Sequence, residues 1–170
     1  MPRIYVALGT NLDDRRGYLR SAIDELKSLI NITAGSSLYE TAPMYVLDQP
    51  PFLNAMIEAT FEGSPLEALK NLKQVERAVG RNERDRCGPR EIDLDLIVYG
   101  NLSYRFESAG SLTLVVPHPR IWERRFVLAP LCEINPELNI PGQGVAFDLL
   151  QKTNDQDSSV LKLTDAVLHL

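Results

Sequence analysis

The stretch from Ile92 to Tyr99, Ile-Asp-Leu-Asp-Leu-Ile-Val-Tyr, decides the fold because its residues alternate as those of a strand do. Side chains of a strand point to opposite faces in turn, so Asp93 and Asp95 are expected on one face, with Cα atoms about 7 Å apart. The apolar residues are expected on the other face, towards the core: Leu94, Leu96 and Val98. The pattern therefore predicts a strand that presents two neighbouring carboxylates.

Upstream of this strand, the apolar periodicity predicts the order strand, helix, strand, strand, helix. The second helix has clear end signals, because Ser64 can cap it, Pro65 suits its first position and Gly80 can end it. With the strand at 92–99, this order is typical of a ferredoxin-like βαββαβ core, an α+β fold with helices packed on an antiparallel sheet. The expected elements are strands at 4–8, 32–39 and 52–61, the last of them half-buried, and helices at 13–30 and 65–79.

Downstream of the strand, the sequence predicts extra C-terminal elements rather than a second domain. A single domain over 1–170 is the natural expectation for this length. The polar stretch 102–110 is expected to be irregular, and 154–159 to be a linker. The other expected elements are a strand at 112–116, a helix that begins after Pro119 and runs towards Leu131, a turn at 141–144, a short helix ending near Leu150 and a last strand at 160–163.

The composition is that of a soluble globular protein, with 44% hydrophobic and 24% charged residues. A net charge of −5 argues against a general nucleic-acid-binding surface. No apolar run reaches the roughly 18 residues of a membrane span, and the N-terminal apolar stretch is too short for a signal peptide. The two cysteines, Cys87 and Cys132, have no metal-binding spacing and fit a reducing compartment, so we expect a cytoplasmic protein.

Arginine clusters on both sides of the strand at 92–99 indicate a polyphosphate ligand, because Arg presents a rigid fork that binds phosphate oxygens in pairs. Two carboxylates side by side repel each other unless a cation lies between them, and Mg²⁺ takes one or two carboxylates together with phosphate oxygens. The residues alone leave two interpretations open: a metal-dependent phosphoryl-transfer site, or aspartates that are solvated or paired with Arg86 or Arg90. The clusters are Arg77, Arg81, Arg84, Arg86 and Arg90, and then Arg120, Arg124 and Arg125.

Two other functions share parts of this pattern. A metal-dependent nucleotide-sugar transferase with an Asp-x-Asp motif would also bind a diphosphate, although the chain is short for such an enzyme. A non-catalytic RNA-binding module could share the ferredoxin-like topology, although the acidic charge argues against it.

Residues 88–97, Gly-Pro-Arg-Glu-Ile-Asp-Leu-Asp-Leu-Ile, resemble the signature of the 6-hydroxymethyl-7,8-dihydropterin pyrophosphokinase family. Further segments resemble the family in the same order and spacing, so the resemblance covers about residues 3–150. They are Ala-Leu-Gly-Thr-Asn-Leu at 7–12, Tyr-Glu-Thr-Ala-Pro at 39–43, Asp-Gln-Pro-Pro-Phe-Leu-Asn-Ala at 48–55, Val-Pro-His-Pro-Arg at 116–120 and Arg-Arg-Phe-Val-Leu-Ala-Pro-Leu at 124–131.

This resemblance implies an enzyme of folate biosynthesis that transfers pyrophosphate from ATP to the hydroxymethyl oxygen of the dihydropterin and releases AMP. It implies that Asp93 and Asp95 hold two Mg²⁺ ions and take part in catalysis together with Arg81 and Arg90. ATP would be the co-substrate, bound by residues at the matching positions: Glu76, Arg81, Arg84, Arg90, Leu96, His118 and Arg124.

For the pterin, the resemblance implies a ring stacked between Phe52 and Phe126, with Asn54 bonded to the ring edge. Lys73 stands where the family usually has Gln, and Cys87 stands where some members have Trp. The other expected pterin contacts are Gly9, Thr41, Ala42 and Met44.

The expected partners are small molecules alone. ATP and the dihydropterin are the expected ligands, and we expect a monomer with no nucleic-acid or membrane partner. The loops at 43–51 and 81–90 are expected to close over both substrates and exclude water.

Overall fold

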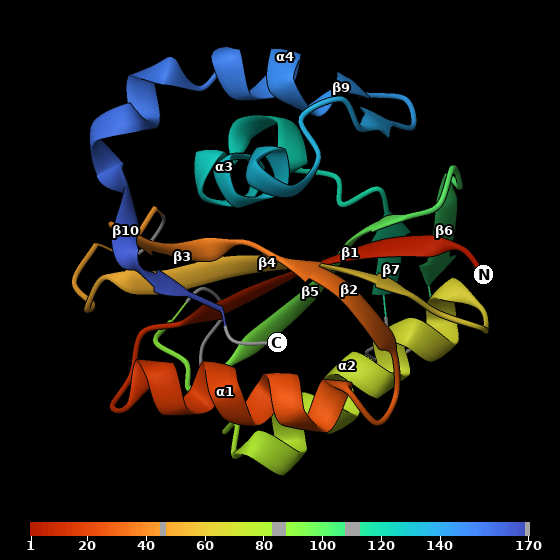
Figure 1. The fold of residues 1–170 in the computed structure, drawn as a ribbon, viewed down its shortest axis with the longest axis horizontal. Coiled ribbons are helices and arrows are strands. Elements are labelled where there is room, and N and C mark those ends of the chain that lie inside the picture. Colours follow the sequence, from red (N-terminus) through yellow and green to blue (C-terminus); the bar gives the residue numbers. More distant parts are fainter. Residues whose placement is uncertain (45–46, 83–87, 108–112, 169–170) are drawn as a thin grey trace.

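The computed structural model describes residues 1–44, 47–82, 88–107 and 113–168, without the side chains of 157–158 and 164–167. Its centre is a six-stranded sheet with the order β10-β3-β4-β1-β5, in which β2 also pairs with β4 and every pairing is antiparallel (Figure 1). The α+β ferredoxin-like core is thereby confirmed, with β10 as an added edge strand. The strands are β1 (Arg3–Thr10), β2 (Asn31–Gly35), β3 (Ser37–Thr41), β4 (Phe52–Thr60), β5 (Asp93–Tyr99) and β10 (Val160–Val167).

Helices cover both faces of the sheet, as Figure 1 shows. On one face lie α1 (Arg15–Leu26) and α2 (Pro65–Val79), where Ser64 and Glu67 form the expected capping box and Gly80 ends the helix in the left-handed conformation. On the other face lies α3 (Arg125–Ile134), with α4 (Ala146–Gln151) beyond it. The sheet therefore separates two hydrophobic cores.

Strand β4 is buried on both faces, so the expectation of a half-buried strand is wrong. Leu53 and Ile57 pack in the core beneath α1 and α2. Met56, on the opposite face, has 0% exposure and packs in the core beneath α3. Strict alternation of apolar and polar residues predicts that one face of the strand is exposed to solvent. In the structure α3, which lies far away in the sequence, covers that face.

A β-bulge in β5 changes the face of the residues that follow it. The register with β1 shifts after Leu96, so that Ile97 is an extra residue in the ladder. Leu94 and Leu96 pack beneath α1 and α2 as expected, whereas Ile97 and Val98 both pack in the core of α3. The expectation that Val98 shares the face of Leu94 is therefore wrong, because the bulge interrupts the alternation. The backbone of Ile97 also accepts a 2.9 Å hydrogen bond from the His118 N–H.

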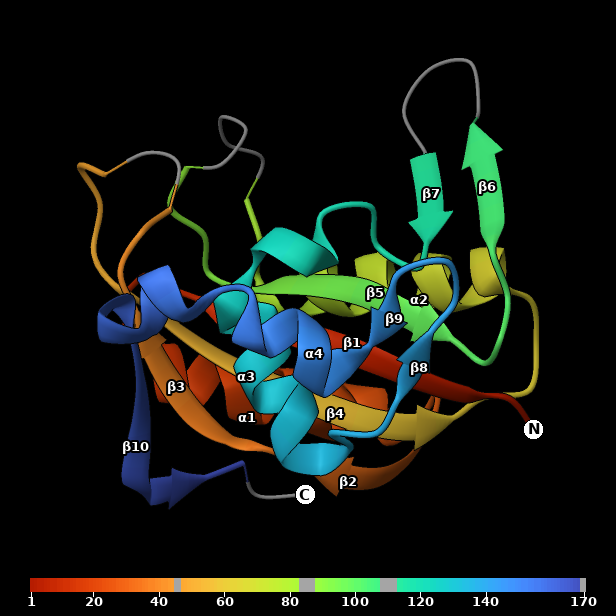
Figure 2. The ribbon, with the colours of Figure 1, turned by 90° about the horizontal axis from the view of Figure 1, so that it is seen from above.

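Two other expected segments differ in the structure. The single strand expected at 32–39 is divided into β2 and β3 at Ser36, whose hydroxyl accepts a 2.9 Å hydrogen bond from the Met56 N–H. Part of the stretch expected to be irregular forms β6 (Tyr104–Glu107), which pairs with β7 (Thr113–Val116) as a projecting ribbon (Figure 2). Residues 104–107 form a strand because they pair with β7, and their polar sequence alone does not predict this.

The C-terminal elements follow the expected order with changed boundaries. A 3₁₀ turn, η1 (Ile121–Glu123), comes before α3, and β8 (Asn139–Ile140) and β9 (Gly144–Val145) flank the expected turn. The expected linker is a 3₁₀ segment, η2 (Asn154–Ser159), which leads into β10. No helix of the described ranges has both the length and the apolar character needed to span a bilayer.

Glu133 on α3 fastens this helix to the edge of the sheet. Its carboxylate accepts hydrogen bonds from the Ser37 N–H at 3.1 Å, the Ser37 hydroxyl at 2.7 Å and the Tyr39 hydroxyl at 2.8 Å. It also pairs with Lys162 of β10 at 3.0 Å. Burial alone would raise the pKa of Glu133, but the bonds from Ser37, Lys162 and Tyr39 outweigh it and lower that pKa. The charged form is therefore the one that the fold stabilises.

Replacing Glu133 with Ala should lower the free energy of unfolding by about 1–2 kcal/mol at pH 7, since bonds to a charged group are lost at a partly exposed site. Because the folded pKa is depressed, this contribution exists above the unfolded pKa and disappears as the pH falls through the folded value. Urea unfolding at pH 7 and pH 3.5 measures both effects. Glu137→Ala, at an exposed glutamate, is the control, and an equal loss in the two variants would contradict the role of Glu133.

Candidate active site

A cavity of about 320 Å³ lies between the ends of β1, β4 and β5 on one side and the start of α3 on the other. It collects side chains from segments that are far apart in the sequence. All seven expected pterin contacts line it, together with both aspartates and most of the expected ATP contacts. The predicted residues in its wall are Gly9, Thr41, Ala42, Met44, Phe52, Asn54, Arg81, Arg90, Asp93, Asp95, His118, Arg124 and Phe126.

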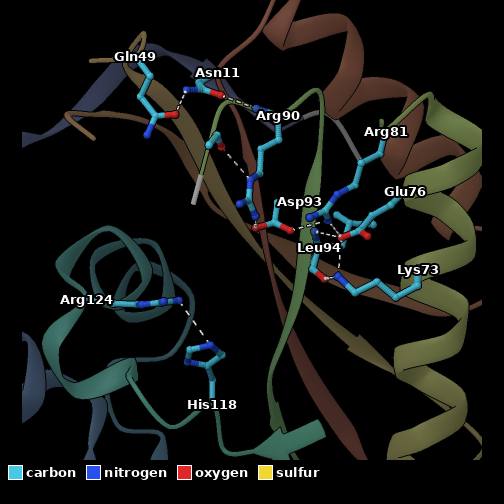
Figure 3. Close-up of polar contacts among 11 residues, drawn as sticks. Asn11, Gln49, Lys73, Glu76, Arg81, Arg90, Asp93, Leu94, His118 and Arg124 are labelled. Carbon is cyan, nitrogen blue, oxygen red and sulfur yellow. Dashed lines mark hydrogen bonds and ion pairs between the residues drawn. The ribbon is translucent and has the colours of Figure 1, made fainter. Parts of the chain in front are cut away.

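Asp93 lies at the centre of a charged cluster (Figure 3). Arg81 donates to one of its oxygens at 2.6 Å, and Arg90 pairs with the other at 2.5 Å. Burial alone would raise the pKa of Asp93, but the charges of Arg90, Lys73 and Arg81 lower it. Asp93 is therefore a stable carboxylate, and the pairing with Arg90 that the sequence left open is present in this structure.

Glu76 connects this cluster to α2. Only 2% of Glu76 is exposed, and its carboxylate accepts 2.7 Å hydrogen bonds from Lys73 and from the Leu94 N–H, and pairs with Arg81 at 2.5 Å. Lys73 reaches the Leu94 carbonyl as well, at 3.3 Å, and its side chain lines the cavity. Sequence reasoning noted Lys73 only as a departure from the family, although its spacing of three residues from Glu76 on a helix already predicts an ion pair.

Asp95 has no such compensation. In the described ranges, no hydrogen bond or ion pair reaches its carboxylate, and it shares a face of β5 with Asp93. Burial, and then the charge of Asp93, raise the pKa of Asp95 to about 6, although Lys73 and Arg124 oppose the rise. A partly buried carboxylate with a raised pKa beside a second carboxylate is where a cation would bind most favourably.

His118 and Arg124 face Asp93 across the cavity, and Figure 3 shows them pointing towards each other. The Nδ1 atom of His118 accepts a 3.2 Å hydrogen bond from the Arg120 N–H. Nε2 lies 3.4 Å from the Arg124 guanidinium. Burial, followed by the charges of Arg124 and Arg120, lowers the pKa of His118 to about 4. At neutral pH the imidazole is therefore uncharged.

The other end of the cavity is suited to a flat polar ring. The Asn54 side chain is buried, and its Nδ2 donates to the Thr41 hydroxyl at 2.7 Å, so its Oδ1 remains an acceptor. Gly9 lies against that oxygen, and a Cβ on Gly9 would come within 2.9 Å of it. Phe52 and Phe126 line the same space, and the Arg124 guanidinium lies 5.7 Å from the centre of the Phe126 ring.

Asn11 joins the two chain segments that border the cavity, as Figure 3 shows. Its side chain donates to Gln49 at 3.1 Å and to the Pro50 carbonyl at 3.0 Å, and it accepts from the Arg90 N–H at 2.9 Å. Asn11 is 2% exposed, and Gln49 lines the cavity. Sequence reasoning did not select either residue, since no local pattern marks a side chain that bonds to two distant loops.

Two expected ATP contacts do not line the cavity, and a third lies outside the described residues. Glu76 is not in the lining itself, but it pairs with two residues that are, Lys73 and Arg81. The Leu96 side chain is 3% exposed and packs in the core beneath α1 and α2, so a contact from Leu96 would have to come from its backbone. Arg84 lies outside the described residues, as does Cys87.

Replacing each of the two aspartates with the neutral Asn should change the free energy of unfolding in opposite directions. Asp95→Asn should raise the free energy of unfolding by about 1–2 kcal/mol at pH 8, less than the full shift implies because the site is partly exposed. The folded pKa of about 6 lies above the unfolded value of 3.8, so wild-type Asp95 destabilises the fold above pH 6 and this cost fades as the pH falls towards 3.8. Asp93→Asn should instead lower the free energy of unfolding by about 1–3 kcal/mol, because Arg81 and Arg90 lose their partner.

Urea unfolding of both variants at pH 8 and pH 4 measures these changes. Asp148→Asn, at an exposed position on α4, is the control. Destabilisation by Asp95→Asn at pH 8 would show that Asp95 has a partner in the folded protein.

Comparison with known proteins gives a consistent result. Residues 5–136 match the family described as 7,8-dihydro-6-hydroxymethylpterin-pyrophosphokinase. A Bacillus subtilis protein named 2-amino-4-hydroxy-6-hydroxymethyldihydropteridine pyrophosphokinase is 42% identical over 132 residues, which cover 76% of each chain. The mitochondrial folate synthesis bifunctional protein of Pisum sativum is 46% identical over 132 residues, 77% of this chain and 25% of the relative. The match therefore spans about a quarter of the plant relatives' length.

Solved structures agree on the fold. The crystal structure of wild-type Plasmodium falciparum HPPK-DHPS with pterin and p-hydroxybenzoate is similar with a TM-score of 0.77 at 14% identity, over 98% of this chain and 46% of that one. A second HPPK-DHPS structure, described as a complex with substrates, has a TM-score of 0.76 over 92% of this chain and 44% of its own. From the match over residues 5–136 and the Bacillus subtilis relative, the chain belongs to the 7,8-dihydro-6-hydroxymethylpterin-pyrophosphokinase family.

Proposed function

We propose that this chain transfers the pyrophosphoryl group of ATP to the hydroxymethyl oxygen of 6-hydroxymethyl-7,8-dihydropterin. The hydroxyl oxygen attacks the β-phosphorus of ATP and its O–H bond breaks, with the proton passing to water. The bond from that phosphorus to the α–β bridging oxygen breaks, and AMP leaves. The observation that carries this proposal is that one cavity combines a paired-carboxylate and arginine end with an aromatic and amide end. Family membership argues against both the nucleotide-sugar transferase and the RNA-binding module.

The donor set of the charged end fits Mg²⁺. Asp93 and Asp95 come from one face of β5, and the Asp95 carboxylate has no partner in the described part of the chain. Those ranges contain no cluster of three or more metal-ligating side chains, so Mg²⁺ held by the two aspartates would take its other ligands from phosphate oxygens and water. We propose two ions, which when bound would neutralise phosphate charge and polarise the attacked phosphoryl group.

The arginines would change partners when ATP binds. Arg81 and Arg90 now neutralise Asp93, and their forked groups suit phosphate oxygens in pairs. Glu76 holds Arg81 and Lys73 near the site, so the positive charges stay in place during the exchange. The uncharged His118 would donate a hydrogen bond from its Nε2 to a phosphate oxygen beside Arg124.

The dihydropterin would occupy the opposite end of the cavity. Phe52 and Phe126 offer flat apolar surfaces for the two faces of its ring. The Oδ1 of Asn54, to which no described residue donates a hydrogen bond, would accept one from the amino group or the N–H donors of the ring edge. Backbone groups at Thr41, Ala42 and Met44 border the same edge.

Product analysis by ³¹P NMR tests the reaction directly. With ATP, Mg²⁺ and the hydroxymethyldihydropterin, the protein should form AMP and a pterin diphosphate. Asp95→Asn should reduce the rate at least about 10²-fold, because it removes one of the two carboxylates proposed to hold Mg²⁺ against the reacting phosphates. Asp148→Asn, on the exposed face of α4, should leave the rate unchanged. Formation of ADP would mean that a single phosphoryl group is transferred, and the proposed reaction would be wrong.

The aromatic end can be tested separately. Phe126→Ala should weaken dihydropterin binding about 10-fold, the usual loss for one stacking surface, and should change ATP binding by less than twofold. Isothermal titration calorimetry with each ligand measures both. Phe147→Ala, at a phenylalanine of α4 with 50% exposure, is the control. Equal pterin affinity in Phe126→Ala and wild type would place the ring elsewhere.

A further inference from the structure

The first turn of α3 is capped by a residue from the far end of the chain. Arg124, at the N-cap position, makes no capping bond with its side chain. Gln156 of η2 provides one instead, because its Oε1 accepts a 3.2 Å hydrogen bond from the Arg125 N–H. Its Nε2 donates to the Glu123 carbonyl at 3.0 Å. One amide thus holds the backbone on both sides of Arg124.

This turn carries two residues of the proposed site. Arg124 lines the charged part of the cavity beside His118, and Phe126 lines the aromatic part. Both side chains project from the few residues that Gln156 holds. The direction of a side chain depends on its own backbone, and the Gln156 amide bonds to the backbone at Glu123 and Arg125, directly before Phe126.

The same segment also holds the opposite wall of the aromatic end. The Ser159 hydroxyl donates to the Gln156 carbonyl at 2.7 Å, and the Ser159 carbonyl accepts from the Ala42 N–H at 3.0 Å. From the next residue, β10 pairs with β3, with Val160 opposite Thr41. A continuous path of hydrogen bonds therefore runs from the start of α3 through η2 to residues 41–42. Figure 1 shows this C-terminal segment passing from α4 to β10 at the edge of the sheet.

A second, smaller cavity marks the place where the two walls meet this segment. It has a volume of about 200 Å³ and adjoins the first cavity through shared lining residues, Thr41, Ala42, Met44 and Phe126. Gln156, Ser159 and Val160 close its other side. Behind the aromatic wall there is free space, so packing alone does not fix the Phe126 side of the site.

We propose that Gln156 is a positioning residue for the dihydropterin site, an inference that rests on the proposed function. It sets the spacing between the Phe126 wall and the Thr41–Met44 wall. The match to the family ends at residue 136, so this device lies in a part of the chain that the family signature does not describe. Glutamine suits the role because one amide both accepts from an N–H and donates to a carbonyl.

Two variants test the proposal by calorimetric titration with 6-hydroxymethyl-7,8-dihydropterin in the presence of a non-hydrolysable ATP analogue. Gln156→Ala removes both bonds and should weaken pterin binding about 5- to 10-fold. ATP binding should change about twofold or less, because Arg81, Arg90 and His118 remain. Gln151→Ala, at an exposed glutamine on α4, is the matched control and should bind as wild type does.

Gln156→Glu supplies a readout that a general loss of stability would not produce. A charged Glu keeps the acceptor for the Arg125 N–H but has no donor for the Glu123 carbonyl, whereas a protonated Glu regains the donor. The ratio of its pterin Kd to the wild-type Kd should therefore be about 5 at pH 8 and fall towards 1 as the pH goes below the ordinary glutamate pKa of about 4.3. The single tryptophan, Trp122 in η1, reports by fluorescence whether the turn remains folded.

The outcomes separate the two proposals. If wild type binds the pterin and all Gln156 variants bind it equally well at every pH, Gln156 has no positioning role. If wild type does not bind the pterin, the proposed function itself fails. If Gln156→Ala does not fold, the pH dependence of the Gln156→Glu ratio decides, and a constant ratio overturns the inference.

Discussion

Two carboxylates on one face of one strand, in a partly buried place, set the electrostatic constraint on which the site depends. Asp93 and Asp95 repel each other, and burial raises the cost of both charges. In the described ranges, ion pairs compensate only one of them. Arg81 and Arg90 pair with Asp93, while Asp95 keeps a raised pKa. Among those residues, one negative charge of the cavity therefore has no paired cation.

Helices pack on both faces of the sheet, and this explains why charged and aromatic side chains line the same cavity. One face of β5 packs against α2, which brings Glu76 and Lys73 to its edge. The other face is covered by α3, whose first turn carries Phe126 and follows Arg124. The bulge at Ile97 bonds to the His118 N–H and so holds the connecting segment against β5. The arginine-rich end and the aromatic end of the cavity therefore form where these layers meet.

Several residues of the cavity have environments that are unfavourable for stability. Asp95 is charged at neutral pH with no partner in the described residues, and His118 is kept neutral by burial beside two arginines. Gly9 has no side chain at a place where a Cβ would come within 2.9 Å of the Asn54 Oδ1. Proteins commonly accept such local costs at functional sites, where the surrounding fold is strong enough to hold them.

The sequence by itself determined the elements whose signals are local. Residues close together in the sequence predict the capping box of α2 and the alternation that puts Asp93 and Asp95 on one face. They also predict the order of elements in the ferredoxin-like core. The family motifs also selected the residues that line the cavity. Only the tertiary structure decided the second buried face of β4, the bulge after Leu96 and the bonds of Asn11 and Gln156. These features depend on contacts between distant segments, and a periodic pattern along the chain carries no information about which segments will meet.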